Sequence, residues 1–338
     1  MSARVMKVLS RFTPDLEIYS IDEAFLSLAG FEDRLETHAR ELRRAVMRWT
    51  GIPVSVGIAP TKMLAKVANR FAKKDAEAEG VLMLPDEASQ EVALARMELT
   101  DLWGVAGRIA KRLSDLGIRT PQQLKAADPQ FIRERFSVVM QRMVFELRGI
   151  SCMRLEHVVA DRKTIMASRS FGQPVTARAE MNEALSSYVA RASERMGRQK
   201  LATSSLIVFV GTNSFRPDDP QCHASHTVHL PVATADTGKL IQAALSALSV
   251  IWRFGFRYKK AGVVPLDLLP AANVQGALFD RPDDSRSHAR MRAIDGLNAR
   301  YGRDTVAFGA AARRRPWKLR SECLSQRYTT HWDELLRV

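Results

Sequence analysis

The sequence has few cysteines and no long hydrophobic run. Cys152, Cys222 and Cys323 are the only three cysteines among 338 residues, and they are far apart and odd in number. We therefore expect no disulfide framework and a reducing, cytoplasmic location. No apolar run reaches the length of a membrane span, and the amino terminus has no signal-peptide pattern. These absences argue against a protein that spans a membrane.

Acidic residues are outnumbered by basic ones. The chain has 37 Asp and Glu against 51 Lys and Arg, a formal net charge of +14. Such an excess indicates a polyanionic partner, either nucleic acid or an anionic membrane surface. Because the basic residues are spread along the chain and not gathered in one amphipathic helix, we favour nucleic acid. Hydrophobic residues make up 46% of the chain, which is typical of a globular protein. The length of 338 residues is enough for two or three domains, each with its own core.

The order of periodic patterns predicts an α+β protein of several domains. An α/β layer comes first, and between 98 and 149 the strand signal disappears in favour of short helices. Residues 162–270 then follow the order β, α, β, β, α, β. A linker at 271–285 precedes a final helix and a short strand. The predicted helices are 1–12, 33–49, 60–72, 180–200, 236–253 and 286–300, and the predicted strands lie within 16–28, 52–58, 81–84, 163–170, 204–212, 225–231, 259–268 and 304–308.

Two adjacent carboxylates interrupt a β-type apolar run at Ile18–Phe25. Charged groups are rarely buried without a partner, because their desolvation costs several kcal/mol. Asp22 and Glu23 therefore predict a tight turn between two strands that aims both carboxylates at a cation. Hard oxygen ligands are those that Mg²⁺ prefers. For an acidic dipeptide taken alone, a solvated hairpin tip is the favoured interpretation, so the neighbouring motifs must decide between the two.

A second motif lies at 102–113, where Gly104 and Gly107 bracket a small apolar hairpin. Such a turn presents backbone N–H groups at the start of a helix, where they and the helix dipole attract a phosphate. This helix-hairpin-helix pattern holds a DNA backbone without reading bases. Arg108, Lys111 and Arg112 add positive charge. The alternative is an ordinary helical turn with a glycine cap.

A third motif is a buried strand that leads into a basic helix at 57–74. The helix carries Lys62, Lys66, Arg70 and Lys73, and it begins near the end of the strand, a common location for phosphate ligands in α/β folds. On spacing alone, a solvated basic face is an equally good interpretation. Among the tryptophans, the helical spacing of Trp49 and Trp252 with apolar neighbours predicts core positions for both.

These motifs, in this order, resemble those of the Y-family DNA polymerases, and most closely the UmuC branch, the catalytic subunit of the SOS mutagenic polymerase. Residues 20–25 resemble the metal motif of the palm, and 56–73 resemble its strand-helix motif. The hairpin at 102–113 resembles the thumb. Residues 168–172, with the βαββαβ unit, resemble the little finger. The resemblance covers essentially the whole chain and implies an error-prone translesion DNA polymerase subunit.

The resemblance also implies a division of the chain and a set of roles. The parts are a partial palm (1–97), a thumb (98–160), a little finger (161–270) and a linker with a UmuC-type tail (271–338, with motifs at 324–330 and 333–338). The implied roles are catalysis and binding of two Mg²⁺ ions by Asp22 and Glu23, triphosphate binding by Lys73, contact with the DNA backbone by Gly104, Val105, Ala106, Gly107, Arg108, Lys111, Ser168, Arg169 and Ser170, and binding of the sliding clamp by Gln275, Leu278 and Phe279. The implied partners are primer-template DNA, the sliding clamp, a processed UmuD-type subunit and RecA.

The clamp peptide also has a physical interpretation. Leu278 and Phe279 stand in an extended polar segment, where two large apolar side chains would be exposed to water. Docking them in a preformed pocket recovers roughly 3 kcal/mol or more. The position after the little finger gives the segment the reach that docking requires.

Nothing in the sequence matches three further elements of the family, which are an opening strand with another metal-binding aspartate, an aromatic steric gate, and the fingers. We therefore expect a polymerase without its first segment and with weak or no activity by itself, because two metal ions need more carboxylates than Asp22 and Glu23 supply. The rival hypothesis is a non-catalytic module that binds DNA and the clamp, as a remnant or a competitor of a full polymerase. A helix-hairpin-helix nuclease or glycosylase would explain neither the carboxylate turn nor the βαββαβ unit.

Overall fold

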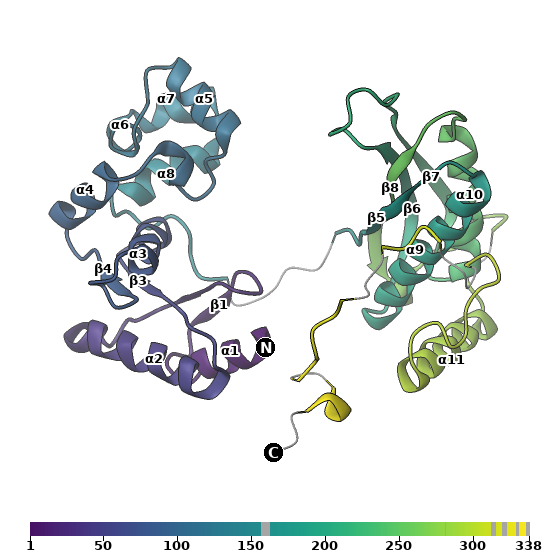
Figure 1. The fold of residues 1–338 in the computed structure, drawn as a ribbon, viewed down its shortest axis with the longest axis horizontal. Coiled ribbons are helices and arrows are strands. Elements are labelled where there is room, and N and C mark those ends of the chain that lie inside the picture. Colours follow the sequence, from purple (N-terminus) through teal and green to yellow (C-terminus); the bar gives the residue numbers. More distant parts are fainter. Residues whose placement is uncertain (157–162, 281, 312–315, 320–322, 329–330, 336–338) are drawn as a thin grey trace. The chain divides into compact units, whose positions relative to one another are not determined.

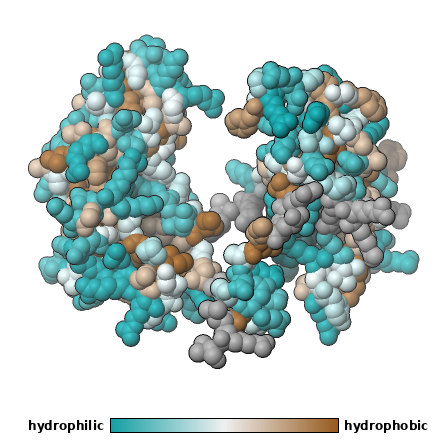
Figure 2. Space-filling model, in the orientation of Figure 1, coloured by the Kyte–Doolittle hydropathy of each residue, from teal (hydrophilic) through white to brown (hydrophobic). Residues whose placement is uncertain are grey.

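The chain forms two compact units, Met1–Val159 and Ala160–Val338 (Figure 1). The computed structural model describes residues 1–156, 163–280, 282–311, 316–319, 323–328 and 331–335. The basic run 313–315 and parts of the predicted tail motifs (329–330 and 336–338) lie outside these residues. Hydrophilic residues cover most of the visible face of each unit (Figure 2). No helix in the described ranges has the length and apolar character needed to cross a bilayer.

The first unit begins with the α/β layer that the sequence predicts. Strands β1 and β2 pair antiparallel around residues 19–23, and β3 pairs in parallel with β4. Strand β3 begins at Val56 and is shorter than predicted; before it, the Val54 carbonyl accepts a hydrogen bond from the Arg43 side chain at 3.1 Å and not from a neighbouring strand. The elements are α1 (Ser2–Leu9), β1 (Leu16–Ile18), β2 (Ala24–Leu26), η1 (Glu32–Arg34), α2 (Leu35–Thr50), β3 (Val56–Ile58), α3 (Lys62–Lys74) and β4 (Val81–Met83).

Short helices complete the first unit. They are α4 (Glu87–Ala95), η2 (Leu99–Asp101), α5 (Gly107–Asp115), α6 (Pro121–Ala126), α7 (Pro129–Arg135) and α8 (Val138–Leu147). One apolar core runs from Met63 of α3 to Leu147 of α8. The fully buried carboxylate of Glu146 accepts hydrogen bonds from the amides of Met63, Cys152 and Met153. The helical part and α3 are therefore held together by shared packing and by buried hydrogen bonds.

The second unit confirms the predicted order β, α, β, β, α, β. Its elements are β5 (Ala167–Val175), α9 (Arg178–Arg198), β6 (Leu201–Thr212), β7 (His223–Thr234), α10 (Thr237–Ile251) and β8 (Tyr258–Pro270). The strands form one antiparallel sheet in the order β5-β8-β6-β7. Helices α9 and α10 cover one face of this sheet (Figure 1), and the apolar core lies between them and the strands.

The chain after the sheet contains η3 (Ala271–Asn273), α11 (Ser285–Tyr301) and η4 (Trp332–Glu334). The predicted strand at 304–308 is wrong. Residues 303–306 form turns and bends, and the Asn298 side chain pairs with both the N–H and the C=O of Val306. Those backbone groups are therefore satisfied without a neighbouring strand.

Of the two tryptophans predicted to lie in the core, Trp252 is buried and Trp49 is not. The prediction of a core position for Trp49 is wrong, since its side chain is half-exposed and the Arg11 guanidinium lies 4.9 Å from its ring. The buried stripe of α2 consists of His38, Ala39, Leu42 and Val46, and Trp49 lies outside it. Trp317, in contrast, is buried in the core of the second unit.

Two buried carboxylates join α11 to the rest of the second unit. Asp236, the N-cap of α10, accepts a hydrogen bond from Ser287 of α11. Asp283, just before α11, accepts hydrogen bonds from Thr234 (2.6 Å) and from Lys239 Nζ (2.9 Å). Burial raises the pKa of each carboxyl, but these hydrogen bonds outweigh it, so both pKa values lie below the ordinary value.

The stability of the second unit should therefore fall in acid. A depressed folded-state pKa contributes stability above the unfolded value, about 3.9 for Asp, and this contribution is lost as pH falls through the folded pKa. We expect the melting temperature to drop steeply below about pH 4. Differential scanning fluorimetry from pH 6 to 2.5 measures it. The melting temperature of Asp283→Asn should fall less steeply with decreasing pH than that of the parent. An unchanged pH dependence would contradict a depressed pKa for Asp283.

Candidate active site and nucleic-acid interface

The carboxylate turn is a tight connection between β1 and β2. The backbone N–H groups of Tyr19 and Ser20 both donate to the carbonyl oxygen of Glu23, at 3.1 and 3.0 Å. The Ser20 hydroxyl donates to Asp22 Oδ1 at 2.6 Å. Asp22 is exposed, and Glu23 is half-buried. The Lys66 ammonium of α3 donates to Glu23 Oε1 at 2.5 Å, so the cation opposite Glu23 in this structure is a lysine.

Three aromatic rings surround the Lys66 ammonium. Its nitrogen lies 5.3 Å from the ring centroid of Tyr19, 5.4 Å from that of Trp103 and 5.9 Å from that of Phe25. The indole N–H of Trp103 donates to the Tyr19 hydroxyl at 3.2 Å. A cation over aromatic faces is attracted by the ring quadrupole. This cage therefore positions Lys66, and through it Glu23, and it connects the carboxylate turn to the segment that precedes the hairpin.

Helix α3 presents a row of basic side chains, most of which have a carboxylate partner. Lys62 forms an ion pair with the buried carboxylate of Glu17, and Arg70 forms one with Asp101. Lys73 lies exposed on the last turn of the helix. Among the described residues no carboxylate pairs with Lys73, so its charge is available to an anionic ligand.

The carboxylates suit a divalent metal in kind but not in number. Asp22 and Glu23 offer hard oxygen donors, as Mg²⁺ requires. No group of three or more His, Cys, Asp or Glu side chains in the described part of the chain could hold a metal ion. Both carboxylates line a largely apolar cavity of about 160 Å³ between β2 and β3, and neither strand has a second partner in the described ranges.

The predicted hairpin leads into α5. Gly104 has φ of +88°, a conformation that favours glycine, and Val105 is buried. Ala106 is the N-cap of α5, and no side chain caps this helix start. Arg108 and Lys111 are exposed on its first turns. The helix start can therefore accept an anion, as the sequence motif predicts.

The remaining predicted site residues lie in the second unit. Ser168, Arg169 and Ser170 belong to β5, where they pair with Gly262, Ala261 and Lys260 of β8. Arg169 and Ser170 are exposed. In the segment after η3, the side chains of Leu278 and Phe279 are 90% and 92% exposed. The structure thus brings Asp22, Glu23 and α3 together with Trp103, while β5 and the 275–279 segment form separate surfaces of the other unit.

The sequence did not predict that Trp103 and Glu17 contact the basic helix, where they meet Lys66 and Lys62. Each is far in sequence from its lysine partner, 37 residues in one case and 45 in the other. The alternation of apolar and charged residues in Leu16–Ile18 was a signal for Glu17, since a charged position on a short buried strand needs a counter-charge.

Comparison with known proteins gives matches along nearly all of the chain. Residues 1–70 match the model of the impB/mucB/samB family, and 162–278 match the model of that family's C-terminal domain. Residues 289–338 match a domain of unknown function.

Similar proteins include Protein UmuC of Salmonella typhimurium, which is 41% identical over 342 residues that cover 100% of this chain and 81% of that protein. Protein MucB of Escherichia coli is 37% identical over 99% of this chain and 80% of its own length. DNA polymerase IV of Moorella thermoacetica is 29% identical over 90% of this chain and 74% of its length. A solved Y-family DNA polymerase chimera shares the fold, with a TM-score of 0.59 and 18% identity, over 79% of this chain and 75% of that one.

Proposed function

The chain belongs to the impB/mucB/samB family of UmuC-type Y-family DNA polymerases and is an error-prone translesion DNA polymerase subunit. We propose that Asp22 and Glu23 are the metal-binding, catalytic carboxylates of this polymerase subunit. The ion pair between Glu23 and Lys66 carries the proposal, because it shows that the turn aims a carboxylate at a cation. Asp22 and Glu23 belong to the partial palm at 1–97. The thumb then corresponds to 98–160, the little finger to 161–270, and the linker and tail to 271–338.

The proposed metal is Mg²⁺, which would assist attack by the primer 3′-hydroxyl and neutralise the triphosphate. Asp22 is free to bind it once its bond from Ser20 is exchanged. Glu23 would share its charge between the metal and Lys66. Lys73, at the far end of α3, would bind the triphosphate through its exposed ammonium. These roles require one face of α3 to meet the carboxylate turn, as the Lys66 contact does.

We expect the 338-residue chain by itself to extend a primer weakly or not at all with Mg²⁺. The described residues supply two carboxylates, Asp22 and Glu23, to the proposed metal site, whereas two bridged metal ions need more oxygen donors. A primer-extension gel with purified chain, template-primer DNA and all four nucleotides measures this. Asp22→Ala is the matched variant, and it should behave like the parent. Robust extension by the parent that Asp22→Ala abolishes would overturn the expectation and would show a complete site.

DNA would be held at two surfaces. In the first unit, the hairpin at 104–107, with Arg108 and Lys111, would bind phosphates through backbone N–H groups and positive charge. In the second unit, Ser168, Arg169 and Ser170 would contact the backbone from β5. Neither surface reads bases, which suits a polymerase that must accept damaged templates.

We also propose that Gln275, Leu278 and Phe279 bind a sliding clamp. Leu278 and Phe279 are almost fully exposed, and a free loop gains nothing from two large apolar side chains in water. We expect the double variant Leu278→Ala and Phe279→Ala to abolish co-migration with the clamp in size-exclusion chromatography. Leu297→Ala with Tyr301→Ala, on exposed positions of α11, is the matched control and should bind normally. Clamp binding by the first variant would discard the assignment.

A processed UmuD-type subunit and RecA are the further proposed partners, on the strength of the family alone. The second candidate function is a non-catalytic module that binds DNA and the clamp. The observation that favours it is the small carboxylate set of the described residues. Primer extension by the chain together with its partner subunits distinguishes the two, since a non-catalytic module would inhibit a full polymerase and would never extend a primer.

A further inference from the structure

Strand β5 leaves its ladder with β8 in the middle of its length. The pairing is regular up to Ser170 and resumes only at Val175. Between these two points, residues 171–174 of β5 stand opposite a single residue of β8, Lys259. Extra residues in one strand form a bulge, which bends that strand and re-aims its side chains. The bulge follows directly on residues 168–170, the proposed DNA contacts of this unit.

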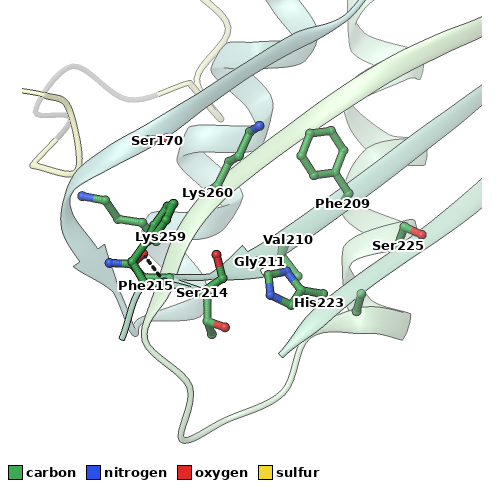
Figure 3. A pocket seen from close by; sticks show the side chains of 13 residues that line it. Ser170, Phe209, Val210, Gly211, Ser214, Phe215, His223, Ser225, Lys259 and Lys260 are labelled. Atoms are coloured by element: carbon green, nitrogen blue, oxygen red, sulfur yellow. Dashed lines mark hydrogen bonds between the residues drawn. The ribbon is translucent and has the colours of Figure 1, made fainter. Parts of the chain in front are cut away.

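Two hydrogen bonds hold the bulge in place. The Lys259 ammonium donates to the carbonyl oxygen of Phe171 at 2.6 Å. Lys259 also lines a groove of about 610 Å³ on the sheet together with Ser170 (Figure 3). The amide of Gly172 donates to the carbonyl oxygen of Trp317 at 2.9 Å. Backbone groups that leave the ladder thus find new partners, one on β8 and one in the C-terminal segment.

The C-terminal segment lies directly on Gly172 through residues 316–319, which we call the clasp. A Cβ placed on Gly172 would lie 2.7 Å from the backbone oxygen of Lys318 and 3.2 Å from the Cα of Leu319. Gly172 is exposed and its φ is ordinary. The close approach of the two backbones, and not the conformation of the strand, therefore requires glycine at this position.

Trp317 anchors the clasp in the core of the second unit. Its indole is buried, and its ring centroid lies 6.0 Å from that of Phe171 and 5.6 Å from that of Tyr188. The other three residues of the clasp are exposed. Buried aromatic side chains dominate the energetics of such contacts. One buried indole and one backbone hydrogen bond thus join the clasp to the bulge of β5.

The clasp is connected to Arg169 through Tyr188. Ala167 and Phe171 of β5 are both buried in the core. Because side chains alternate along a strand, Arg169 leaves β5 on the same face as these two residues. Burial raises the pKa of the Tyr188 hydroxyl, and the charge of Arg169 is near enough to oppose the rise. Trp317 therefore packs on a ring that lies within electrostatic range of Arg169.

We propose that the clasp is a positioning element, which fixes the bulge of β5 and thereby holds Arg169 in the place where it binds a DNA phosphate. The proposal rests on the proposed DNA contact by residues 168–170. It gives a function to the C-terminal domain of unknown function, whose match at 289–338 contains the clasp. A strand that is ordered before binding loses less conformational entropy when it binds. The clasp acts through β5 and does not itself bind DNA.

Gly172→Ala tests the proposal, because the added Cβ separates the clasp from β5. Fluorescence anisotropy of the full chain with a labelled 20-base-pair blunt duplex measures the effect. We expect the dissociation constant to rise about tenfold, as the ordering of about one backbone residue predicts. The slope of log K against log salt should fall by about one, as it should for Arg169→Ala. Hydrogen exchange in peptides from 167–175 should become faster.

The double variant Gly172→Ala with Arg169→Ala distinguishes positioning from a general loss of stability. If the clasp acts through Arg169, the double variant binds the duplex as weakly as Arg169→Ala alone. If the two effects on the dissociation constant multiply, the clasp does not act through Arg169 and the proposal is overturned.

Two variants of the C-terminal segment serve as controls. Gly309→Ala makes the same substitution at an exposed position where no atom of the described residues lies within 4 Å of the added Cβ, and it should bind the duplex like the parent. Lys318→Ala removes the positive charge of the clasp and should keep the salt slope of the parent. A reduced slope for Lys318→Ala would show that the clasp itself binds DNA, which would overturn the proposal.

A measurement on the parent decides the question even if Gly172→Ala does not fold. By thermodynamic linkage, a clasp that strengthens DNA binding is itself held more firmly when DNA is bound. Hydrogen exchange of peptides that contain 316–319 should therefore slow with saturating duplex, and unchanged exchange overturns the proposal. A parent that does not bind the duplex overturns the proposed DNA contact as well. Normal binding by both the parent and Gly172→Ala overturns the role of the clasp alone.

Discussion

Replacing Gly57 with alanine should unfold the layer that carries the candidate active site. A Cβ at this position would lie 2.1 Å from the backbone N of Asn69 and 2.3 Å from the backbone O of Ala65. Both are backbone atoms of α3, so no side-chain rotation relieves the overlap. Strand β3 and helix α3 must move apart, at an expected cost of about 3 kcal/mol or more. The same shift would carry Lys66 away from Glu23.

Urea denaturation of the full chain measures the loss, and hydrogen exchange with mass spectrometry of peptides from 56–74 locates it. Gly107→Ala is the matched control in the same unit, since no atom of the described residues lies within 4 Å of its added Cβ and its φ is ordinary. That variant should keep the parent's urea midpoint within the range of a surface substitution. Fast exchange in 56–74 only for Gly57→Ala is the expected result. Parent-like protection there would show that the strand and helix are not packed as described.

Trp317→Ala should produce the second large effect, in the other unit. The indole is 6% exposed and packs against Tyr188 and Phe171, with ring centroids at 5.6 and 6.0 Å. Its backbone carbonyl accepts a hydrogen bond from Gly172 of β5. Truncation of a buried tryptophan costs about 3–5 kcal/mol, which for a unit of this size lowers the melting temperature by roughly 10 °C.

Trp332→Ala provides the matched control, because that indole is 87% exposed and its loss should leave the melting temperature unchanged. Calorimetry of the full chain measures both variants. Trp317 lies within the match to a domain of unknown function at 289–338. The expected difference would show that this segment completes the core of the second unit. Equal melting temperatures for the two variants would mean that the C-terminal segment only covers the surface.

Sequence patterns succeeded where the interaction is local. The turn between β1 and β2 follows from Asp22 and Glu23 inside an apolar β run, and the structure has it. The βαββαβ order of 167–270 follows from apolar periods of two and 3.6. The apolar character of Leu278 and Phe279 in a polar segment predicted exposure, and both side chains are exposed. In each case the residues adjacent in sequence are enough to predict the structure.

Patterns failed where a distant segment decides the outcome. Trp49 has helical spacing, but the helix turns its other side to the core. The strand predicted at 304–308 does not form, and the Asn298 side chain makes hydrogen bonds to the backbone N–H and C=O of Val306. The partners of the basic helix, Glu17 for Lys62 and Trp103 for Lys66, are distant in sequence, so no periodicity could pair them.

The sequence by itself determined the family, the order of the elements and the identity of the candidate carboxylates, because these depend on residue types and local spacing. Only the tertiary structure decided what surrounds them. It placed Lys66 against Glu23 within three aromatic rings, and it brought Trp317 of the C-terminal segment into the core of the second unit beside Phe171 and Tyr188. The physical reason is that cation–π contacts, ion pairs and core contacts depend on distances in space. Chain folding sets these distances between segments that are far apart in sequence, and the local pattern of one segment carries no information about its partner.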